Sequence, residues 1–368
     1  MTQRLPPSLT SLDTALAAWL HGREPVAPSD LPLAEAAGCI VADVPPLPAL
    51  PPRDVAAVDG WAFRADDLVG ASAYSPVAPS VPAVWVEAGE AVPDGCDCVL
   101  DEAALDMSMP LPQVLSEAAP GQGVRRAASD SDGQTSVIAE GRRVDPAVLL
   151  LARLAKLESL RVRRPRLRIV NVPGTATTAH LIAEMARADG LQVTLQSAEG
   201  RDPAAIAAML DAADCDLLLT IGGSGVGRTD AAVTALARSG EMIAHGLALQ
   251  PGRTVALGRI GSVPAAILPG APDHALAAWF ALVCPLVDRL TARLPRRQRA
   301  LPLARKIASQ VGIAEVALLA QDGASWIPRA VGEWPLHAIA GAAAWRIIPA
   351  SHEGFAAGTP IEAYLIWE

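Results

Sequence analysis

The sequence predicts a multidomain α/β protein, in which a parallel-sheet α/β domain carries an inserted β-rich lid domain and is followed by a C-terminal β domain. The chain has 368 residues, more than one hydrophobic core usually organises. Apolar runs alternate with helical patterns between residues 167 and 293, which is typical of a parallel sheet covered on both faces. Short β-like runs separated by turn residues occupy residues 54–140 and the last part of the chain.

The N-terminal part contains two expected helices and a crossover. Residues 9–21 repeat apolar side chains at helical spacing and predict an amphipathic helix. A short helix over residues 33–37 is expected before the apolar run 39–41. Residues 44–52 hold so many prolines that helix and central strand are excluded, so we expect an extended crossover between domains.

The segment that follows the crossover predicts a small β-rich domain inserted into another domain. Its clearest β-like runs are residues 81–88, 98–100 and 135–139. The chain is expected to return over residues 142–163, with a helix over 145–155.

The sheet domain begins at residue 167. We expect its strands at residues 167–172, 193–196, 217–221, 254–258 and 264–268. We expect one helix after the Pro173-Gly174 turn that ends near Gly190, and further helices at residues 203–213, 230–238 and 273–293. A charged hinge at 294–299 then leads to β-like runs at 316–319, 344–349 and 361–366, with a hairpin-type Asp322-Gly323 between the first two.

These patterns divide the chain into four parts. The expected bounds are 27–49 with 141–165 for a connecting domain, 50–140 for the lid, 5–26 with 166–295 for the α/β domain, and 296–368 for the C-terminal β domain.

Composition excludes several classes of protein. The net charge of −9 argues against a nucleic-acid binder, and the basic run 161–166 is interpreted as solvated residues that lead into a strand. Five scattered cysteines argue against a disulfide framework or a zinc site. We expect no signal peptide and no membrane span, so a cytoplasmic protein is the default.

The most informative motif is Gly222-Gly223-Ser224-Gly225-Val226-Gly227, which follows an apolar strand and precedes a helix. Bare backbone N–H groups at such a position bind phosphate or another oxyanion without basic side chains. A plain strand–helix turn is the alternative. We favour the ligand site, because four glycines in one short loop exceed what a turn needs.

Two other motifs are weaker by themselves. Residues 268–273 place Pro269, Gly270 and Pro272 in a stiff turn before a long helix, and this turn would line the same crevice if strands 217–221 and 264–268 are neighbours. Asp59-Gly60-Trp61 after the proline-rich crossover reads as an ordinary turn.

Taken in order, five stretches resemble the MoeA family of molybdopterin molybdenumtransferases, to which the gephyrin E domain also belongs. They are residues 51–67, 89–102, 121–130, 222–230 with 250–253, and 268–272. The resemblance implies a MogA-like α/β domain and a reaction in which molybdate displaces AMP from adenylylated molybdopterin with the help of Mg²⁺. It also implies a homodimer, because in such enzymes the lid domain faces the partner's sheet domain.

The resemblance assigns roles by position. Catalytic roles fall on Asp59, Asp130 and Asp230, and metal binding falls on Asp230 and Asp202. Pterin and phosphate binding fall on Gly222, Gly223, Ser224, Gly225, Gly227, Arg253, Pro269, Gly270 and Pro272. Further partners implied are a client molybdoenzyme and the adenylyltransferase of the same pathway, with no nucleic acid and no membrane.

The sequence departs from the family pattern at several positions. The turn after the first strand of the sheet domain, residues 172–178, has no carboxylate where the family carries Gly-Asp-Glu. Gln250 replaces a lysine, Ala271 an asparagine and Ala88 a threonine, and Arg201-Asp202-Pro203 replaces Asp-Asp-Pro. Loss of a lysine removes a cation that would hold an anion.

Three hypotheses therefore stand. A molybdenumtransferase is favoured, since Asp59, Asp130 and Asp230 are all present. A catalytically weak protein that binds or delivers the cofactor is the alternative, motivated by the missing acidic turn. An adenylyltransferase acting one step earlier is disfavoured by the lid and by the C-terminal β domain.

Overall fold

The computed structural model describes residues 3–108 and 112–366. The chain divides into two compact units. The first consists of residues 1–43, 140–146 and 159–368, and the second of residues 44–139 and 147–158.

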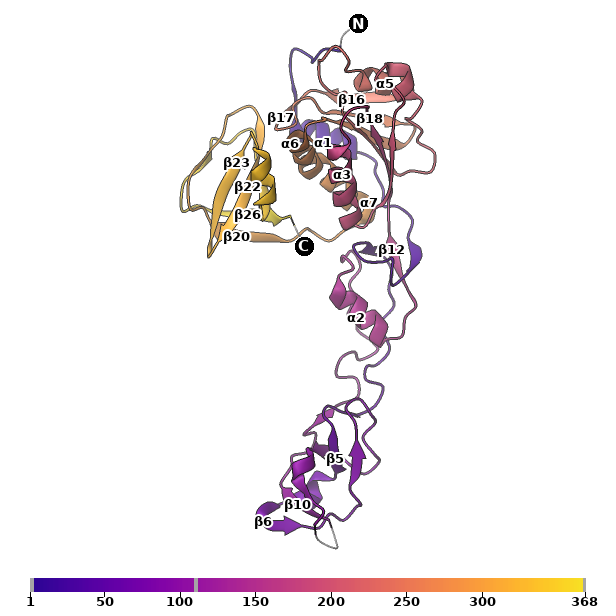
Figure 1. The fold of residues 1–368 in the computed structure, drawn as a ribbon, viewed down its shortest axis with the longest axis vertical. Coiled ribbons are helices and arrows are strands. Elements are labelled where there is room, and N and C mark those ends of the chain that lie inside the picture. The colour runs from indigo at the N-terminus through magenta and orange to yellow at the C-terminus, as the bar shows by residue number, and fades with distance from the viewer. Residues whose placement is uncertain (1–2, 109–111, 367–368) are drawn as a thin grey trace. The chain divides into compact units, whose positions relative to one another are not determined.

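A six-stranded sheet forms the centre of the first unit (Figure 1), in the order β14-β13-β15-β19-β18-β16 among the described residues. Its strands are β13 (Arg166–Asn171), β14 (Gln192–Ser197), β15 (Leu217–Ile221), β16 (Glu241–His245), β18 (Ala256–Ile260) and β19 (Val263–Leu268). The first four in sheet order are parallel. The prediction of a parallel sheet is wrong for β18 and β16, which pair antiparallel, because the two-residue turn Gly261-Ser262 folds β18 directly back onto β19.

Helices pack on this sheet. They are α1 (Leu12–Leu20), α3 (Thr177–Ala188), α4 (Pro203–Ala207), α5 (Ala232–Ser239), α6 (Pro272–Ala278), the π-helical turn η3 (Trp279–Val283) and α7 (Cys284–Thr291). α4 is shorter than the expected 203–213, since the N–H groups of Met209 and Leu210 donate to carbonyls three residues back and form turns instead of continuing the helix. α5 begins two residues later than expected, because the Asp230 side chain is used in the preceding loop.

The run Pro272–Thr291, which comprises α6, η3 and α7, is long and apolar enough to cross a membrane by length and composition. Its most apolar window is 78% buried inside the protein. Trp279, Phe280 and Leu282 lie in the main hydrophobic core. The run is therefore the core helix of the α/β part.

A seven-stranded sheet contains the C-terminal strands, in the order β1-β17-β22-β24-β26-β20 with β23 paired to β22. Its strands are β1 (Thr10–Ser11), β17 (Leu247–Gln250), β20 (Gln298–Pro302), β22 (Ala314–Asp322), β23 (Ser325–Val331), β24 (Ala344–Ile348) and β26 (Pro360–Leu365). The hairpin predicted at Asp322-Gly323 is confirmed, with Asp322 opposite Ser325. Beside this sheet lie β21 (Ile307–Ala308), β25 (Gly354–Phe355) and α8 (Leu336–Ala340).

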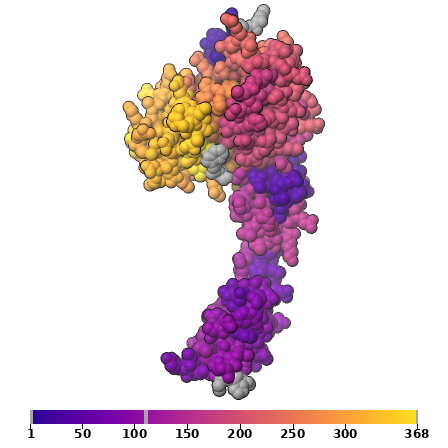
Figure 2. Space-filling model, in the orientation of Figure 1, coloured from indigo at the N-terminus to yellow at the C-terminus, as the bar shows by residue number. Residues whose placement is uncertain are grey.

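The C-terminal strands share a core with the α/β part. Val316, Leu318 and Trp345 belong to the same buried cluster as Trp279 and Phe280. Phe280 stacks on Trp345 with ring centroids 4.9 Å apart. Figure 2 shows the yellow C-terminal surface packed against the orange and magenta surface of this unit.

A small three-stranded sheet in the first unit joins an N-terminal segment to the segment that precedes β13. β12 (Ser159–Arg163) pairs with β2 (Ser29–Pro32) and β3 (Ile40–Val41). The predicted helix 33–37 is wrong: these residues form turns, with the Glu35 N–H donating to the carbonyl of Pro32. Another such bond, from the Cys39 N–H to the carbonyl of Ala36, spans three residues and closes a second turn before β3.

The second unit is β-rich, as predicted. It contains β4 (Val55–Ala56), β5 (Gly60–Phe63), β6 (Ser72–Val77), β7 (Val84–Val86), β8 (Cys98–Leu100), β9 (Leu105–Asp106), β10 (Gln113–Ser116), β11 (Val124–Arg125), the 3₁₀ turns η1 (Ala65–Leu68) and η2 (Glu102–Ala104), and all but the first residue of α2 (Pro146–Leu154). The predicted strand 135–139 is wrong, because the Asp132 carboxylate accepts the N–H groups of Gln134 and Thr135 and holds bends there.

Candidate functional site

The loops after β15 and β19 lie side by side. The two strands pair in parallel, with Ile221 opposite Leu268, which confirms that they are neighbours. The Gly222 N–H donates to the carbonyl of Leu268 at 2.9 Å. The glycine loop, residues 222–227, and the proline turn, residues 269–272, therefore meet at one edge of the sheet, where open parallel sheets bind ligands.

A crevice of about 410 Å³ opens at this edge. Its lining comes from the turns after β13, β15 and β19, and consists of Asn171, Val172, Pro173, Gly174, Thr175, Arg201, Ile221, Gly222, Gly223, Ser224, Gly225, Asp230, Thr254, Pro269, Gly270, Ala271 and His274.

Three helices begin beside the crevice. The N-cap residues of α3, α5 and α6 are Ala176, Ala231 and Ala271, and in the described part of the chain none of the three helices has a side-chain cap. The first N–H groups of α3 consequently keep their donor capacity, as do those of α6 after Pro272, which has no N–H, whereas the Ala232 N–H at the start of α5 donates to the Gly223 carbonyl at 3.1 Å. Since the N-terminal end of a helix carries a partial positive charge, this edge favours an anion.

The glycine loop needs its glycines. Gly222 and Gly223 have φ values of 93° and 72°, a region that side chains with a Cβ rarely adopt. A Cβ on Gly223 would lie 3.0 Å from the Cβ of Ala232, and one on Gly225 would lie 2.7 Å from Oδ2 of Asp230. A bulkier residue would push the loop away from its helix.

Side chains from distant parts of the chain hold this loop. The hydroxyls of Ser224 and Thr254 are 2.9 Å apart and hydrogen bonded. His245 Nε2 lies 3.3 Å from the carbonyl oxygen of Ser224. The Gln3 side-chain amide donates to the carbonyl oxygens of Gly223 and Gly225.

Burial lowers the pKa of His245 below its ordinary value, although the hydrogen bond to the Ser224 carbonyl opposes this shift. The imidazole is therefore neutral near pH 7. Because its partner is a carbonyl, Nε2 carries the proton and donates it.

Of the described residues that line the crevice, Asp230 is the one carboxylate and Arg201 the one guanidinium. Asp230 Oδ2 accepts the N–H of Gly227 at 2.9 Å, and Oδ1 lies 3.7 Å from Nη2 of Arg201. Arg201 also donates through Nη1 to the carbonyl of Pro173 at 2.8 Å. These contacts link the turns after β13 and β14 to the glycine loop.

The structure brings most of the predicted binding residues together. Gly222, Gly223, Ser224, Gly225, Pro269 and Gly270 line the crevice. Gly227 does not line the crevice itself, but its N–H donates to Asp230, which does. Pro272 is the first residue of α6. Arg253 is exposed in the turn after β17, and the neighbouring Thr254 lines the crevice in its place.

The two predicted metal residues have different environments. Asp202 is the N-cap of α4, where Oδ1 accepts the N–H groups of Ala204 and Ala205, both at 3.0 Å. Asp202 is not among the lining residues, whereas Asp230 is. Across residues 3–108 and 112–366, no group of three or more His, Cys, Asp and Glu side chains could hold a metal.

Asp59 and Asp130 lie in the second unit. Asp59 Oδ1 accepts the N–H of Ala88 at 2.7 Å, so its turn is braced against the loop after β7. Asp130 Oδ1 lies 2.7 Å from Nη2 of Arg125, in an ion pair. Contacts within the second unit thus orient both carboxylates.

Sequence reasoning missed Gln3, His245, Thr254 and Arg201 as residues of this site. Arg201 stands next to a recognised motif and could have been considered for that reason. Gln3, His245 and Thr254 carry no local signal, since only the fold brings them to the glycine loop.

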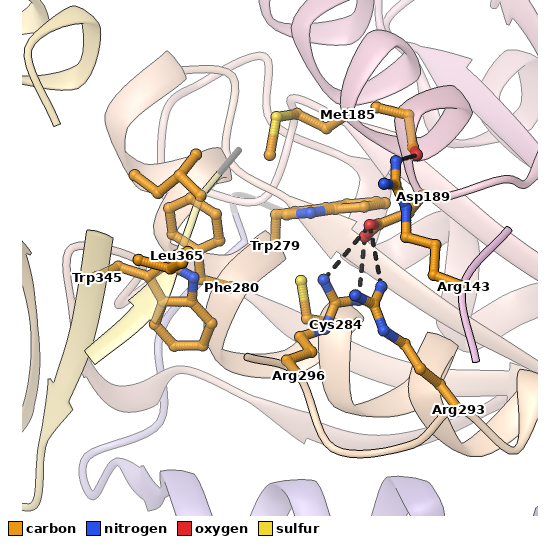
Figure 3. Close-up of a pocket in the computed structure, with 12 residues that line it drawn as sticks. Arg143, Met185, Asp189, Trp279, Phe280, Cys284, Arg293, Arg296, Trp345 and Leu365 are labelled. Carbon is orange, nitrogen blue, oxygen red and sulfur yellow. Dashed lines mark hydrogen bonds and ion pairs between the residues drawn. The ribbon is translucent and has the colours of Figure 1, made fainter. Parts of the chain in front are cut away.

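A second, smaller pocket of about 110 Å³ lies between α3, the core helix and the C-terminal strands (Figure 3). Asp189 accepts from Arg293 and Arg296, and Arg296 also pairs with Asp288 at 2.9 Å. Burial raises the pKa of the Cys284 thiol, so it is protonated. Because Arg293 and Arg296 are already ion paired, this cluster holds the end of α3 to the end of α7.

Comparison with known proteins agrees with this architecture. A family model for the MoeA N-terminal region (domain I and II) matches residues 10–155. A model described as "Probable molybdopterin binding domain" matches residues 168–289, which include the glycine loop and the proline turn.

Individual relatives match over most of the chain. Molybdopterin molybdenumtransferase 2 of Mycobacterium tuberculosis is 31% identical over 314 residues, covering 73% of this chain and 76% of that protein. Molybdopterin molybdenumtransferase of Synechococcus elongatus is 26% identical over 366 residues, covering 85% and 88%. A structure of the molybdopterin biosynthesis MoeA protein from Pyrococcus horikoshii has a TM-score of 0.74 at 20% identity and covers 97% of this chain and 100% of that one, a likeness of fold.

Proposed function

Since the chain belongs to the MoeA family of molybdopterin molybdenumtransferases, we propose that it inserts molybdate into adenylylated molybdopterin with release of AMP. The chain is thus an enzyme of molybdenum cofactor biosynthesis. The observation that carries the proposed site is the crevice at the ends of β15 and β19, where the glycine loop and the uncapped starts of α3 and α6 meet at one cavity.

The chemical demand is to hold anions without burying unpaired charge. The substrate brings a pterin phosphate joined to AMP, and molybdate is a second anion. Backbone N–H groups and helix ends can bind phosphate oxygens and are already oriented for them. Arg201 supplies a single cation beside them, and its bond to Pro173 restricts where the guanidinium can go.

Asp230 is the residue we propose for Mg²⁺. Magnesium is commonly held by one or two carboxylates together with substrate phosphates, and Asp230 is the carboxylate that lines the crevice. When bound, the metal would offset negative charge at the phosphoanhydride. Asp202 does not fit this role, because its carboxylate caps α4.

We further propose a homodimer in which Asp59 and Asp130 act on the substrate held in the partner's crevice. The proposal rests on the family resemblance and on the position of these carboxylates in the second unit. Complementation tests it. Random mixing of Asp59→Ala and Asp230→Ala subunits makes half of the dimers mixed, each with one intact site, so about a quarter of the parent activity should return. Mixed subunits as inactive as each variant alone would reject the shared site.

Neither alternative is favoured by an observation of the structure. A binding or delivery protein for a client molybdoenzyme would bind the cofactor tightly without turnover. An adenylyltransferase would form the adenylylated product from molybdopterin and ATP. A cytoplasmic location, and contacts with a client or with the adenylyltransferase, stay predictions.

The deciding experiment is AMP release from adenylylated molybdopterin, molybdate and Mg²⁺, with Asp59→Ala and Asp230→Ala beside the parent. We expect release by the parent and loss in both variants. An inactive parent, under conditions in which an ordinary relative turns over, would reject the function.

A further inference from the structure

Three successive carbonyl groups of the glycine loop are held from outside the loop. The Gln3 amide nitrogen lies 3.2 Å from the carbonyl oxygen of Gly223 and 2.5 Å from that of Gly225. The carbonyl between them, of Ser224, accepts from His245. Gln3 is 8% exposed, so its two bonds are shielded from water.

In a trans peptide the C=O and the following N–H point in opposite directions. The anchors on the three carbonyls therefore direct the N–H groups of Ser224, Gly225 and Val226 away from Gln3 and His245. Within residues 3–108 and 112–366, none of these three N–H groups donates to a protein acceptor. Ser224 and Gly225 line the crevice, so the anchored loop has donors available for an anion.

The position of Gln3 is itself determined by the fold. The side chains of Leu5, Pro6 and Leu9 lie so close to Gly246 that a Cβ there would be 3.0 to 3.2 Å from them. The Thr10 N–H donates to the Gly246 carbonyl at 3.0 Å. The orientation of the Gln3 amide follows from its neighbours, since two carbonyl oxygens require the nitrogen.

We propose that Gln3 is a positioning residue, which orients the peptide groups of the glycine loop so that their N–H groups meet the phosphate oxygens of the substrate. This inference rests on the proposed function for its ligand. Its structural part, the ordering of the loop by Gln3, stands separately.

Two substitutions and one control test it. Gln3→Met keeps the length and packing of the side chain but removes both donors, and Gln3→Ala removes the packing as well. Ser8→Ala changes an exposed residue of the same segment. Residue-resolved hydrogen exchange of the Gly222 and Gly227 amides, which donate to the Leu268 carbonyl and to Asp230, reports loop order without turnover. Steady-state AMP release separates KM from kcat.

With either Gln3 variant we expect loop exchange to accelerate about tenfold and the KM for adenylylated molybdopterin to rise about tenfold, with kcat within about twofold. Ser8→Ala should match the parent. Unchanged loop exchange and KM in Gln3→Met would overturn the inference, whether or not Gln3→Ala is impaired, because packing alone would then explain the residue. A parent without AMP release would reject the proposed function, while the exchange measurement would still decide the role of Gln3.

Discussion

Nη2 of Arg201 lies 3.7 Å from Oδ1 of Asp230, and the two residues are the ionic groups of one crevice. The pair joins the turn before α4 to the glycine loop. Asp230 is at the same time a hydrogen-bond acceptor for Gly227. One carboxylate thus shapes the loop and fixes the position of the nearest cation.

Asp230 and Asp202 should behave differently when substituted. Asp230→Ala removes the acceptor of the Gly227 N–H and the partner of Arg201, so AMP release should fall by roughly tenfold or more. Asp202→Ala removes the cap of α4 and should lower the free energy of unfolding by about 1 kcal/mol, with AMP release within about twofold. Equal losses of activity in the two variants would instead support the predicted metal pair.

Glycine at position 223 is expected to be required for binding. Gly223→Ala adds a methyl group 3.0 Å from the Cβ of Ala232 at a φ of +72°, whereas Gly261→Ala at +59° meets nothing within 4 Å. Both substitutions should lower the free energy of unfolding by about 1–2 kcal/mol, because a residue with a Cβ is strained at a left-handed φ. Only Gly223→Ala should also raise the KM for adenylylated molybdopterin, which steady-state kinetics will measure beside thermal unfolding. A KM shift of the same size in Gly261→Ala would mean that general destabilisation is responsible.

His245 should make stability depend on pH. Its folded-state pKa is lowered by burial from the ordinary value of 6.5, so the unfolded chain binds this proton first as the pH falls. Stability therefore decreases from about pH 7 down to the folded-state pKa. Thermal melting between pH 8 and 5 should show a steeper loss for the parent than for His245→Gln, which keeps an amide donor without the titration. Parallel curves would show that His245 does not contribute.

The arginine cluster of Figure 3 is expected to stabilise the fold and to play no part in turnover. Arg296→Ala leaves Asp189 and Asp288 without their shared partner, and should cost about 3 kcal/mol. Arg297→Ala, the same charge change at an exposed neighbour, should cost less than about 0.5 kcal/mol. Denaturant unfolding measures both, and the KM of Arg296→Ala should equal that of the parent. A raised KM in that variant would place the cluster in the site.

Local sequence correctly predicted the elements that are marked by a continuous apolar run or by several glycines close together. The apolar run 217–221 became β15 with the expected bounds. The glycines after it formed an open loop, because the positive φ values at Gly222 and Gly223 disfavour residues with a Cβ. The two errors at 33–37 and 135–139 have a shared cause. In both segments, hydrogen bonds between residues close in the chain formed turns. The energy of such a bond is too small for the residue types alone to predict it.

By itself the sequence determined the family, the α/β core and the glycine loop, since each depends on neighbours along the chain or on motifs in a given order. Tertiary structure alone decided which groups surround that loop. It brought Gln3 to Gly225 and His245 to Ser224, joined β1 and β17 to the C-terminal sheet, and assigned Asp202 to a helix cap rather than to the crevice. Contacts between residues far apart in the chain depend on the folded path of the backbone, which no local pattern encodes.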